Sequence, residues 1–150
     1  MTRTSTVPPT TFTPATGESK TALFGGNSNW RGPVWTPINF LLIEALRNYH
    51  EYYGETLTVE MPTGSGNQVT LAEAADDLAR RLIGLFTLDS SGRRPGMGEH
   101  LADDDPLARE AVLFHEYFHG ETGEGLGASH QTGWTALVAN LIQPCIGPIS

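Results

Sequence analysis

Two segments of this 150-residue chain combine aromatic, amide, guanidinium and carboxylate side chains with glycines. The first covers residues 27–35 and holds two tryptophans and an arginine; the second covers residues 115–134 and holds three glutamates and three histidines. Polar side chains are costly in a protein core unless each one finds a partner. In a sugar pocket, by contrast, aromatic rings stack on the C–H face of a pyranose, and amide or guanidinium groups bond its hydroxyls. Both segments therefore indicate a carbohydrate-binding pocket.

Glu116 is the residue in these segments best suited to chemistry, because Tyr117 and Phe118 follow it directly. Aromatic neighbours exclude water from a carboxylate, and a carboxylate in such surroundings can act as a general base toward a water molecule. Its position, where a predicted third helix gives way to glycine-rich sequence, also fits a solvated glutamate at a helix end. On the residues alone this second interpretation is favoured.

Apolar periodicity predicts helices around the two segments. The first helix follows Thr36 and Pro37, which are read as an N-cap and a first-turn proline, and Gly54 ends it. Its predicted core stripe consists of apolar residues spaced by three and four: Ile38, Leu41, Leu42, Ala45, Leu46 and Tyr49.

The rest of the chain predicts a small hairpin and three more helices. Alternating residues over 57–61 and a return over 68–69 indicate two short β-strands. A capping box, Thr70 to Glu73, opens a second helix that reaches Phe86. A third helix is expected over residues 105–114, and a fourth from about Gly133 until Pro144 stops it.

Composition restricts the class of protein. A formal net charge of −8 with 39% hydrophobic residues describes a globular domain whose field repels phosphate backbones, so nucleic acid is not an expected partner. The single cysteine, Cys145, excludes an internal disulfide. No apolar run resembles a signal peptide or approaches the ~20 residues that span a bilayer, which predicts a cytoplasmic protein without membrane contact. Residues 1–21, rich in Thr, Ser and Pro, are expected to form a flexible arm ahead of one domain over residues 22–150.

Residues 27–35 with the helix that follows, and the run from Glu116 to Leu137, resemble the C-terminal part of glycoside hydrolase family 63. The likeness is greatest to its bacterial glucosylglycerate and mannosylglycerate hydrolase branch. The second run contains Glu116-Tyr117-Phe118, Gly123-Glu124-Gly125, Gln131 and Gly133-Trp134-Thr135-Ala136-Leu137. The likeness extends over about residues 18–143. It implies a mainly α-helical chain that forms part of an (α/α)6 toroid, and inverting hydrolysis of an α-glucosidic or α-mannosidic bond.

The resemblance assigns roles to individual residues. Glu116 matches the family's general base, and the positions that line its substrate site are matched by Trp30, Arg31, Trp35 and Gln131. For the tryptophans the alternative is packing between helices, and for Gln131 it is an N-terminal helix cap. The reaction requires no cofactor.

Inversion also needs a general acid ~6.5–9.5 Å from the base. In the family this acid is an aspartate upstream of the tryptophan-arginine segment, and no segment of this sequence matches that region. Only four helices are predicted here, whereas six helical hairpins need many more. We therefore expect a portion of a glycosidase domain without its acid, with glucosylglycerate or mannosylglycerate as candidate substrates. Its expected partner is the missing half of the barrel or a second copy of the chain.

Two other interpretations stay open. A domain without its acid could persist as a sugar-binding or helical interaction module, because uncovered apolar helix faces seek partners. The run from His115 to His119 also fits the His-Glu-x-x-His pattern of zinc metallopeptidases, with His130 as a candidate third ligand. Against zinc, Gly120 follows directly and is expected to end the helix that would have to present both histidines.

Overall fold

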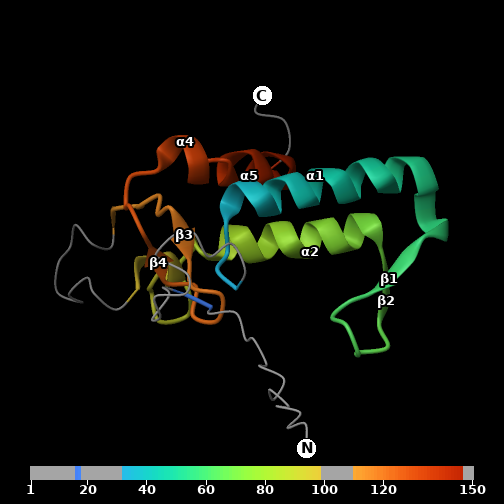
Figure 1. The fold of residues 1–150 in the computed structure, drawn as a ribbon, viewed down its shortest axis with the longest axis horizontal. Coiled ribbons are helices and arrows are strands. Elements are labelled where there is room, and N and C mark those ends of the chain that lie inside the picture. The colour runs from blue at the N-terminus through green and yellow to red at the C-terminus, as the bar shows by residue number, and fades with distance from the viewer. Residues whose placement is uncertain (1–15, 18–31, 99–109, 147–150) are drawn as a thin grey trace, which may run out of the picture.

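The computed structural model describes residues 16–17, 32–98 and 110–146 (Figure 1). Its largest unit is a pair of antiparallel helices, α1 (Thr36–Tyr53) and α2 (Leu71–Gly84), which pack side by side. This helical hairpin provides the platform on which the loops with the candidate residues are built.

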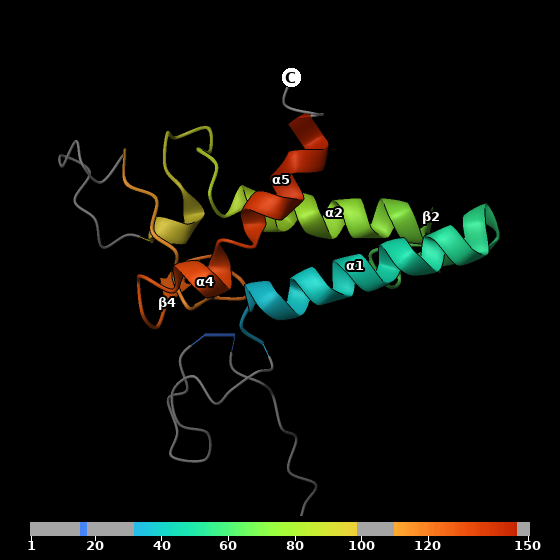
Figure 2. The same ribbon diagram turned by 90° about the horizontal axis from the view of Figure 1, so that it is seen from above.

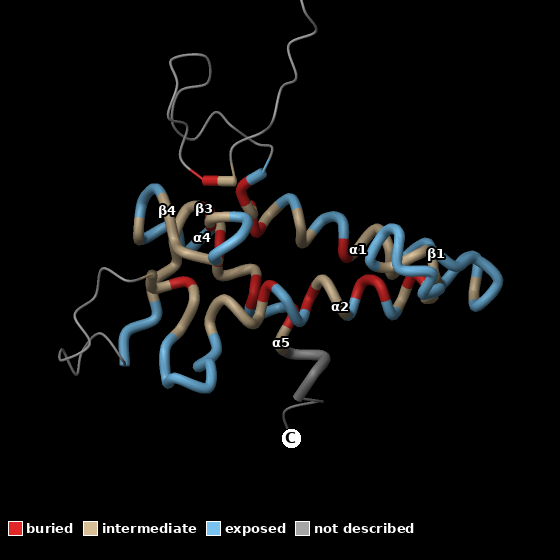
Figure 3. The backbone as a smooth tube through the Cα atoms, turned by 90° about the horizontal axis from the view of Figure 1, so that it is seen from below, coloured by how far each residue is buried: buried red, intermediate tan, exposed pale blue. Residues whose placement is uncertain are grey.

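The connection between α1 and α2 is a 3-10 turn, η2 (Gly54–Thr56), followed by a hairpin of β1 (Thr58–Glu60) and β2 (Gln68–Thr70). Helix α5 (Val138–Ile146) packs against both long helices (Figure 2). The hydrophobic core lies where these helices meet (Figure 3), and its buried members are Ile43, Ala75, Ala79, Leu82 and Leu141.

Three of the predicted signals at helix and strand ends are confirmed. Gly54 ends α1 with a φ of 59°, a backbone conformation that favours glycine. Thr70 and Glu73 form the expected capping box: the Thr70 hydroxyl accepts the Glu73 N–H at 3.2 Å, and Glu73 Oε2 accepts the Thr70 N–H at 2.8 Å. The predicted hairpin pairs Val59 with Val69.

Two predictions about α1 are wrong. The N-cap residue is Trp35, and Thr36 is already helical. Most of the predicted core stripe faces solvent, with exposed fractions of 65% at Leu41 and 57% at Tyr49. The face that packs against the core carries Phe40, Ile43 and Leu46. The helix has apolar residues on two sides, and periodicity alone does not reveal which side meets α2.

The C-terminal half is less regular than predicted. Residues 111–116 are not helical, so the third helix does not reach Phe114, and its expected start at Asp105 lies outside the described residues. The predicted last helix is two helices, α4 (Thr132–Thr135) and α5, and Pro144 lies within α5. Their apolar spacing is continuous, which is why the sequence does not reveal the break.

A looped region lies beside the N-terminal end of α1 (Figure 1). Its centre is a second antiparallel pair, β3 (Tyr117–Phe118) with β4 (Gly125–Leu126), and a 3-10 turn, η3 (Pro95–Met97), contacts β4. Helices with two small two-stranded sheets confirm the predicted, mainly α-helical class. Among the described residues, no helix is both long and apolar enough to cross a membrane.

Candidate active site

The segment that carries Glu116 is paired with other chain segments on both sides. On one side the Glu116 N–H donates to the Ala128 carbonyl at 2.8 Å. On the other side the Phe118 N–H donates to the Val34 carbonyl at 2.9 Å, and the Val34 N–H returns to Phe118 at 2.8 Å. Trp35 follows Val34 directly, so this pairing brings together the two segments that the sequence singles out.

The Glu116 carboxylate turns back onto the segment that follows β4. Its Oε2 accepts the N–H of Ala128 at 3.2 Å, and the side chain is only partly buried. Gly127 makes this arrangement possible, because a Cβ there would lie 2.6 Å from Glu116 Oε2 and 2.8 Å from Tyr117 Cε1. One carboxylate oxygen is therefore held by the backbone, as a positioned base requires.

Trp35 reaches this region through Tyr117. The two rings stack with centroids 4.5 Å apart, and Trp35 meets Trp134 edge-on at 6.4 Å. Trp35 is 2% and Tyr117 1% exposed, so the stack forms a dry, fixed wall beside the Glu116 segment. Trp30 and Arg31, the other candidates of the first segment, lie outside the described residues.

From the sequence, Tyr117 is expected only to exclude water from Glu116, although a signal for its packing role exists. Successive residues of a strand point to opposite faces. A strand that starts at Tyr117 therefore turns the rings of Tyr117 and Phe118 to opposite faces, and the Tyr117 ring packs against Trp35. The expectation of a helix up to Phe114 concealed this alternation.

Gln131 occupies the N-cap position of α4, but its side chain makes no capping bond. Its main chain bonds in two directions. The Gln131 N–H donates to the Phe114 carbonyl at 2.8 Å, and the Gln131 carbonyl accepts the Thr135 N–H at 2.9 Å at the start of α4. The Gln131 side chain is exposed, so its amide is accessible to solvent. The main chain of Gln131 is thus tied to Phe114, two positions before Glu116.

The two histidines of the His-Glu-x-x-His pattern do not lie on a helix. Residues 117–118 are strand β3, and four extended residues span ~13 Å, against ~6 Å for one helical turn. His119 Nδ1 accepts the N–H groups of Glu121 at 3.2 Å and Thr122 at 3.3 Å, and its Nε2 lies 3.4 Å from Thr16 Oγ1. In the described part of the chain no three His, Cys, Asp or Glu residues form a group that could hold a metal ion. The metallopeptidase interpretation therefore lacks the geometry it needs.

His115 packs inside the looped region. Its ring lies against Gly125, where a side chain would not fit, and meets Phe118 edge-on at 6.3 Å. Burial lowers the pKa of His115 below its ordinary value; the charge of Glu124 opposes this shift, and that of His130 adds to it. A neutral, packed imidazole supports the β3–β4 pair.

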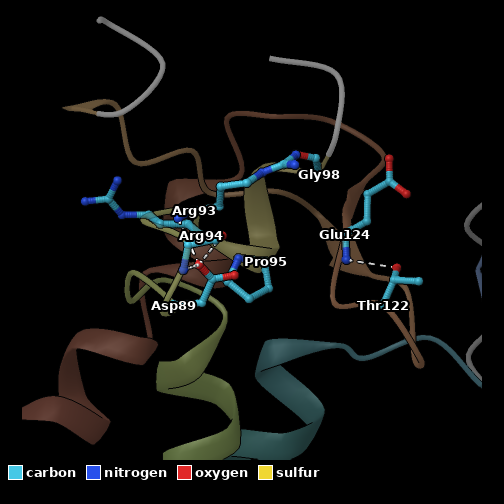
Figure 4. A pocket seen from close by; sticks show the side chains of 8 residues that line it. Asp89, Arg93, Arg94, Pro95, Gly98, Thr122 and Glu124 are labelled. Atoms are coloured by element: carbon cyan, nitrogen blue, oxygen red, sulfur yellow. Dashed lines mark hydrogen bonds between the residues drawn. The ribbon is translucent and has the colours of Figure 1, made fainter. Parts of the chain in front are cut away.

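A separate hollow of about 530 Å³ lies between the loop after α2 and the turn after β3 (Figure 4). Its lining residues are Asp89, Ser91, Arg93, Arg94, Pro95, Gly98, Thr122 and Glu124. Both arginines bond to backbone there: Arg93 Nη2 donates to the Gly98 carbonyl and Arg94 Nε to the Phe86 carbonyl, each at 3.0 Å. These bonds hold the loop in place, which is a structural role for both guanidinium groups.

Residues 3–135 match the family described as the mannosylglycerate hydrolase MGH1-like glycoside hydrolase domain. The chain belongs to this family. The match covers both segments that carry the candidate residues, and it confirms the resemblance inferred from them.

Two curated proteins of Saccharomyces cerevisiae are similar to this MGH1-like domain. The uncharacterized protein YMR196W is 54% identical over 129 residues, which are 84% of this chain and 12% of that protein. A mannosyl-oligosaccharide glucosidase is 29% identical over 120 residues, which are 79% of this chain and 11% of that protein. The chain therefore spans a small part of the length of both relatives. No solved structure matches it.

Proposed function

We propose that this MGH1-like domain takes part in the inverting hydrolysis of an α-glucosidic or α-mannosidic bond, with Glu116 as the general base. In such a reaction a carboxylate removes a proton from water while the water oxygen attacks the anomeric carbon. An acid on the opposite side of the sugar protonates the leaving oxygen. The family description and the printed name of the yeast glucosidase support this class of reaction.

The observation that carries the proposal is the placement of the Glu116 carboxylate. The Ala128 N–H holds one of its oxygens at 3.2 Å, and the buried Tyr117–Trp35 stack fixes the residue that follows it in the chain. A base that is held in place does not have to be ordered during the reaction. This lowers the entropic part of the activation free energy of hydrolysis.

Trp30, Arg31, Trp35 and Gln131 are the candidates for sugar binding, and in this proposal Trp30, Arg31 and Gln131 make the direct contacts. Gln131 offers an exposed amide that can bond sugar hydroxyls. Trp35 is only 2% exposed, so we assign its contribution to the support of Tyr117 and the base. Glucosylglycerate and mannosylglycerate are the proposed substrates, in keeping with the family description.

We further propose that residues 22–150 form one portion of an (α/α)6 toroid, whose remainder supplies the general acid. The α1–α2 hairpin has the form of one helical repeat of such a toroid. The much greater length of both yeast relatives is in keeping with a larger domain. The competing function is an interaction or sugar-binding module without turnover, which the exposed side of α1 favours.

A chimera tests the proposal. In it, this chain replaces the 129-residue matching segment of YMR196W, which supplies the remaining polypeptide. We expect the chimera to hydrolyse glucosylglycerate, mannosylglycerate or an aryl α-glucoside with inversion, as seen in the anomer first released. Glu116→Gln should lower kcat by about 10²–10⁴-fold, whereas Glu121→Gln, on the exposed turn after β3, should leave it unchanged.

Two results would count against Glu116 as the base: unchanged turnover in Glu116→Gln, or release of the product with retained configuration. Binding of the same sugars by the chimera without turnover would favour the module instead. The isolated chain serves as the reference for both measurements.

A further inference from the structure

The side chain of Thr135, the last residue of α4, bonds outside its own helix. Thr135 is 0% exposed, and its Oγ1 donates to the carbonyl of His115, 20 residues earlier in the chain. A threonine in a helix can instead bond a carbonyl three or four residues back along the same helix. A buried hydroxyl without a partner is costly, so the bond to His115 satisfies a group that would otherwise destabilise the fold. The Thr135 hydroxyl therefore joins α4 to the segment that carries Glu116.

The carbonyl that Thr135 binds belongs to the peptide group between His115 and Glu116. The N–H of the same peptide group is that of Glu116, and it donates to the Ala128 carbonyl at 2.8 Å. This planar group is therefore held at both of its polar atoms, by α4 on one side and by the segment after β4 on the other. It cannot turn about its long axis without breaking a bond. Because the Cα of Glu116 lies in the same plane, the two bonds fix the point from which the side chain of the proposed base starts.

Helix α4 also binds the residue before His115. The N–H of Gln131, the N-cap residue of α4, donates to the Phe114 carbonyl at 2.8 Å. Two successive carbonyls are thus bound from the two ends of one short helix, and the Thr135 N–H connects those ends by donating to the Gln131 carbonyl at 2.9 Å. Helix α4 in turn contacts α1 near the N-terminal end of that helix (Figure 2). The segment before Glu116 is therefore attached to an ordered part of the fold.

We propose that Thr135 is a positioning residue for the general base: its hydroxyl holds the peptide group before Glu116 and so sets the direction from which the carboxylate meets water. The inference rests on the proposed function, in which Glu116 takes the proton from water. One carboxylate oxygen is bound to the Ala128 N–H at 3.2 Å, and that bond requires the main chain of Glu116 to keep its place beside Ala128. Loss of the Thr135 hydroxyl would let the peptide group turn. A displacement of about 1 Å can lower a rate by about 10²-fold.

The competing interpretation is that Thr135 only fills the core, and Thr36 provides the comparison. Thr36 is 1% exposed, and its hydroxyl makes no hydrogen bond with the part of the chain that the structure describes. Replacement by valine removes the same hydroxyl at both positions, whereas only Thr135 touches the peptide group before Glu116. A packing role predicts similar effects of the two replacements on turnover. A positioning role predicts that only the replacement at Thr135 lowers it.

The test uses the YMR196W chimera and measures kcat, KM and hydrogen exchange. Thr135→Val should lower kcat by about 10–10²-fold with KM little changed, because the hydroxyl acts only through the base. Thr135→Ser keeps the hydroxyl and loses the methyl group, so it should keep most of the wild-type kcat although it leaves a small cavity. Thr135→Ala differs from the serine variant by the oxygen alone and should match the valine variant in kcat. Thr36→Val should leave kcat at the wild-type value.

Hydrogen exchange followed by mass spectrometry reports on the peptide group itself. The proteolytic fragment that contains Glu116 should take up deuterium faster in Thr135→Val than in the wild type, because one of the two bonds that hold this segment is lost. In Thr36→Val its uptake should not change. This measurement does not depend on turnover, so it examines the contact separately from the chemistry.

A double variant distinguishes the positioning role from the role of the base. Because Thr135 acts through Glu116, adding Thr135→Val to Glu116→Gln should lower kcat no further. Additive losses in the double variant, equal losses in the serine and alanine variants, or unchanged exchange in Thr135→Val would overturn the proposal. Wild-type turnover in Glu116→Gln would overturn the assignment of the base and the proposal with it. Wild-type turnover in Thr135→Val beside an inactive Glu116→Gln would overturn the positioning role alone.

Discussion

Replacement of Gly127 by alanine is expected to destabilise the fold by about 2–5 kcal/mol in total. Gly127 has a φ of 69°, where an L-residue costs ~1–2 kcal/mol. The new methyl group would also lie 2.8 Å from Tyr117 Cε1 and 2.9 Å from Glu116 Cβ. Tyr117 cannot move aside easily, because it is 1% exposed and stacked on Trp35. Overpacking of this kind adds ~1–3 kcal/mol.

Gly64→Ala is the matched control for this prediction. Its φ of 82° imposes similar backbone strain, but a Cβ there would meet nothing within 4 Å. The control should therefore cost only ~1–2 kcal/mol. Urea denaturation followed by tryptophan fluorescence measures both variants. Equal losses of unfolding free energy at the two positions would refute the close packing of Gly127 against Glu116 and Tyr117.

Three further changes test other parts of the structure. Thr70→Ala removes the N-cap hydroxyl of α2 and should lower the free energy of unfolding in urea by ~1 kcal/mol; an unchanged value would contradict the cap. Gly120→Ala should weaken the near-UV circular dichroism signal, because its methyl would meet the backbone carbonyl of Gly32, which cannot rotate away. Acidification below pH 6.5, the ordinary pKa of His115, should lower the melting midpoint: burial lowers the folded-state pKa, so the unfolded chain takes up the proton first. His115→Gln should flatten this part of the pH profile, and a wild-type midpoint independent of pH there would contradict it.

The features predicted correctly are short-range ones. The capping box of Thr70 and Glu73 joins groups three residues apart, and Gly54 ends α1 through its own φ. Such signals depend on a few neighbouring residues, so the sequence contains all the information they need. The same holds for the hairpin of β1 and β2, whose turn lies between two alternating segments.

The predictions that failed depended on partners distant in the sequence. Leu41 and Ile43 both belong to apolar stripes, and only the position of α2 decides that Ile43 is buried. Phe118 forms a strand because Val34 and Gly125 pair with it from two sides. Without these partners the segment reads as the end of a helix, or as a zinc-binding motif.

The sequence by itself determined the family and the helical class, because these follow from residue types and their local order, and the resemblance to the family then singled out Glu116 as the candidate base. The tertiary structure alone decided that the Glu116 strand lies between Val34 and Ala128, and that Tyr117 carries the contact to Trp35. The physical reason is that strand pairing and ring stacking join residues far apart along the chain. Their free energy depends on which surfaces meet in space, and local sequence does not specify that.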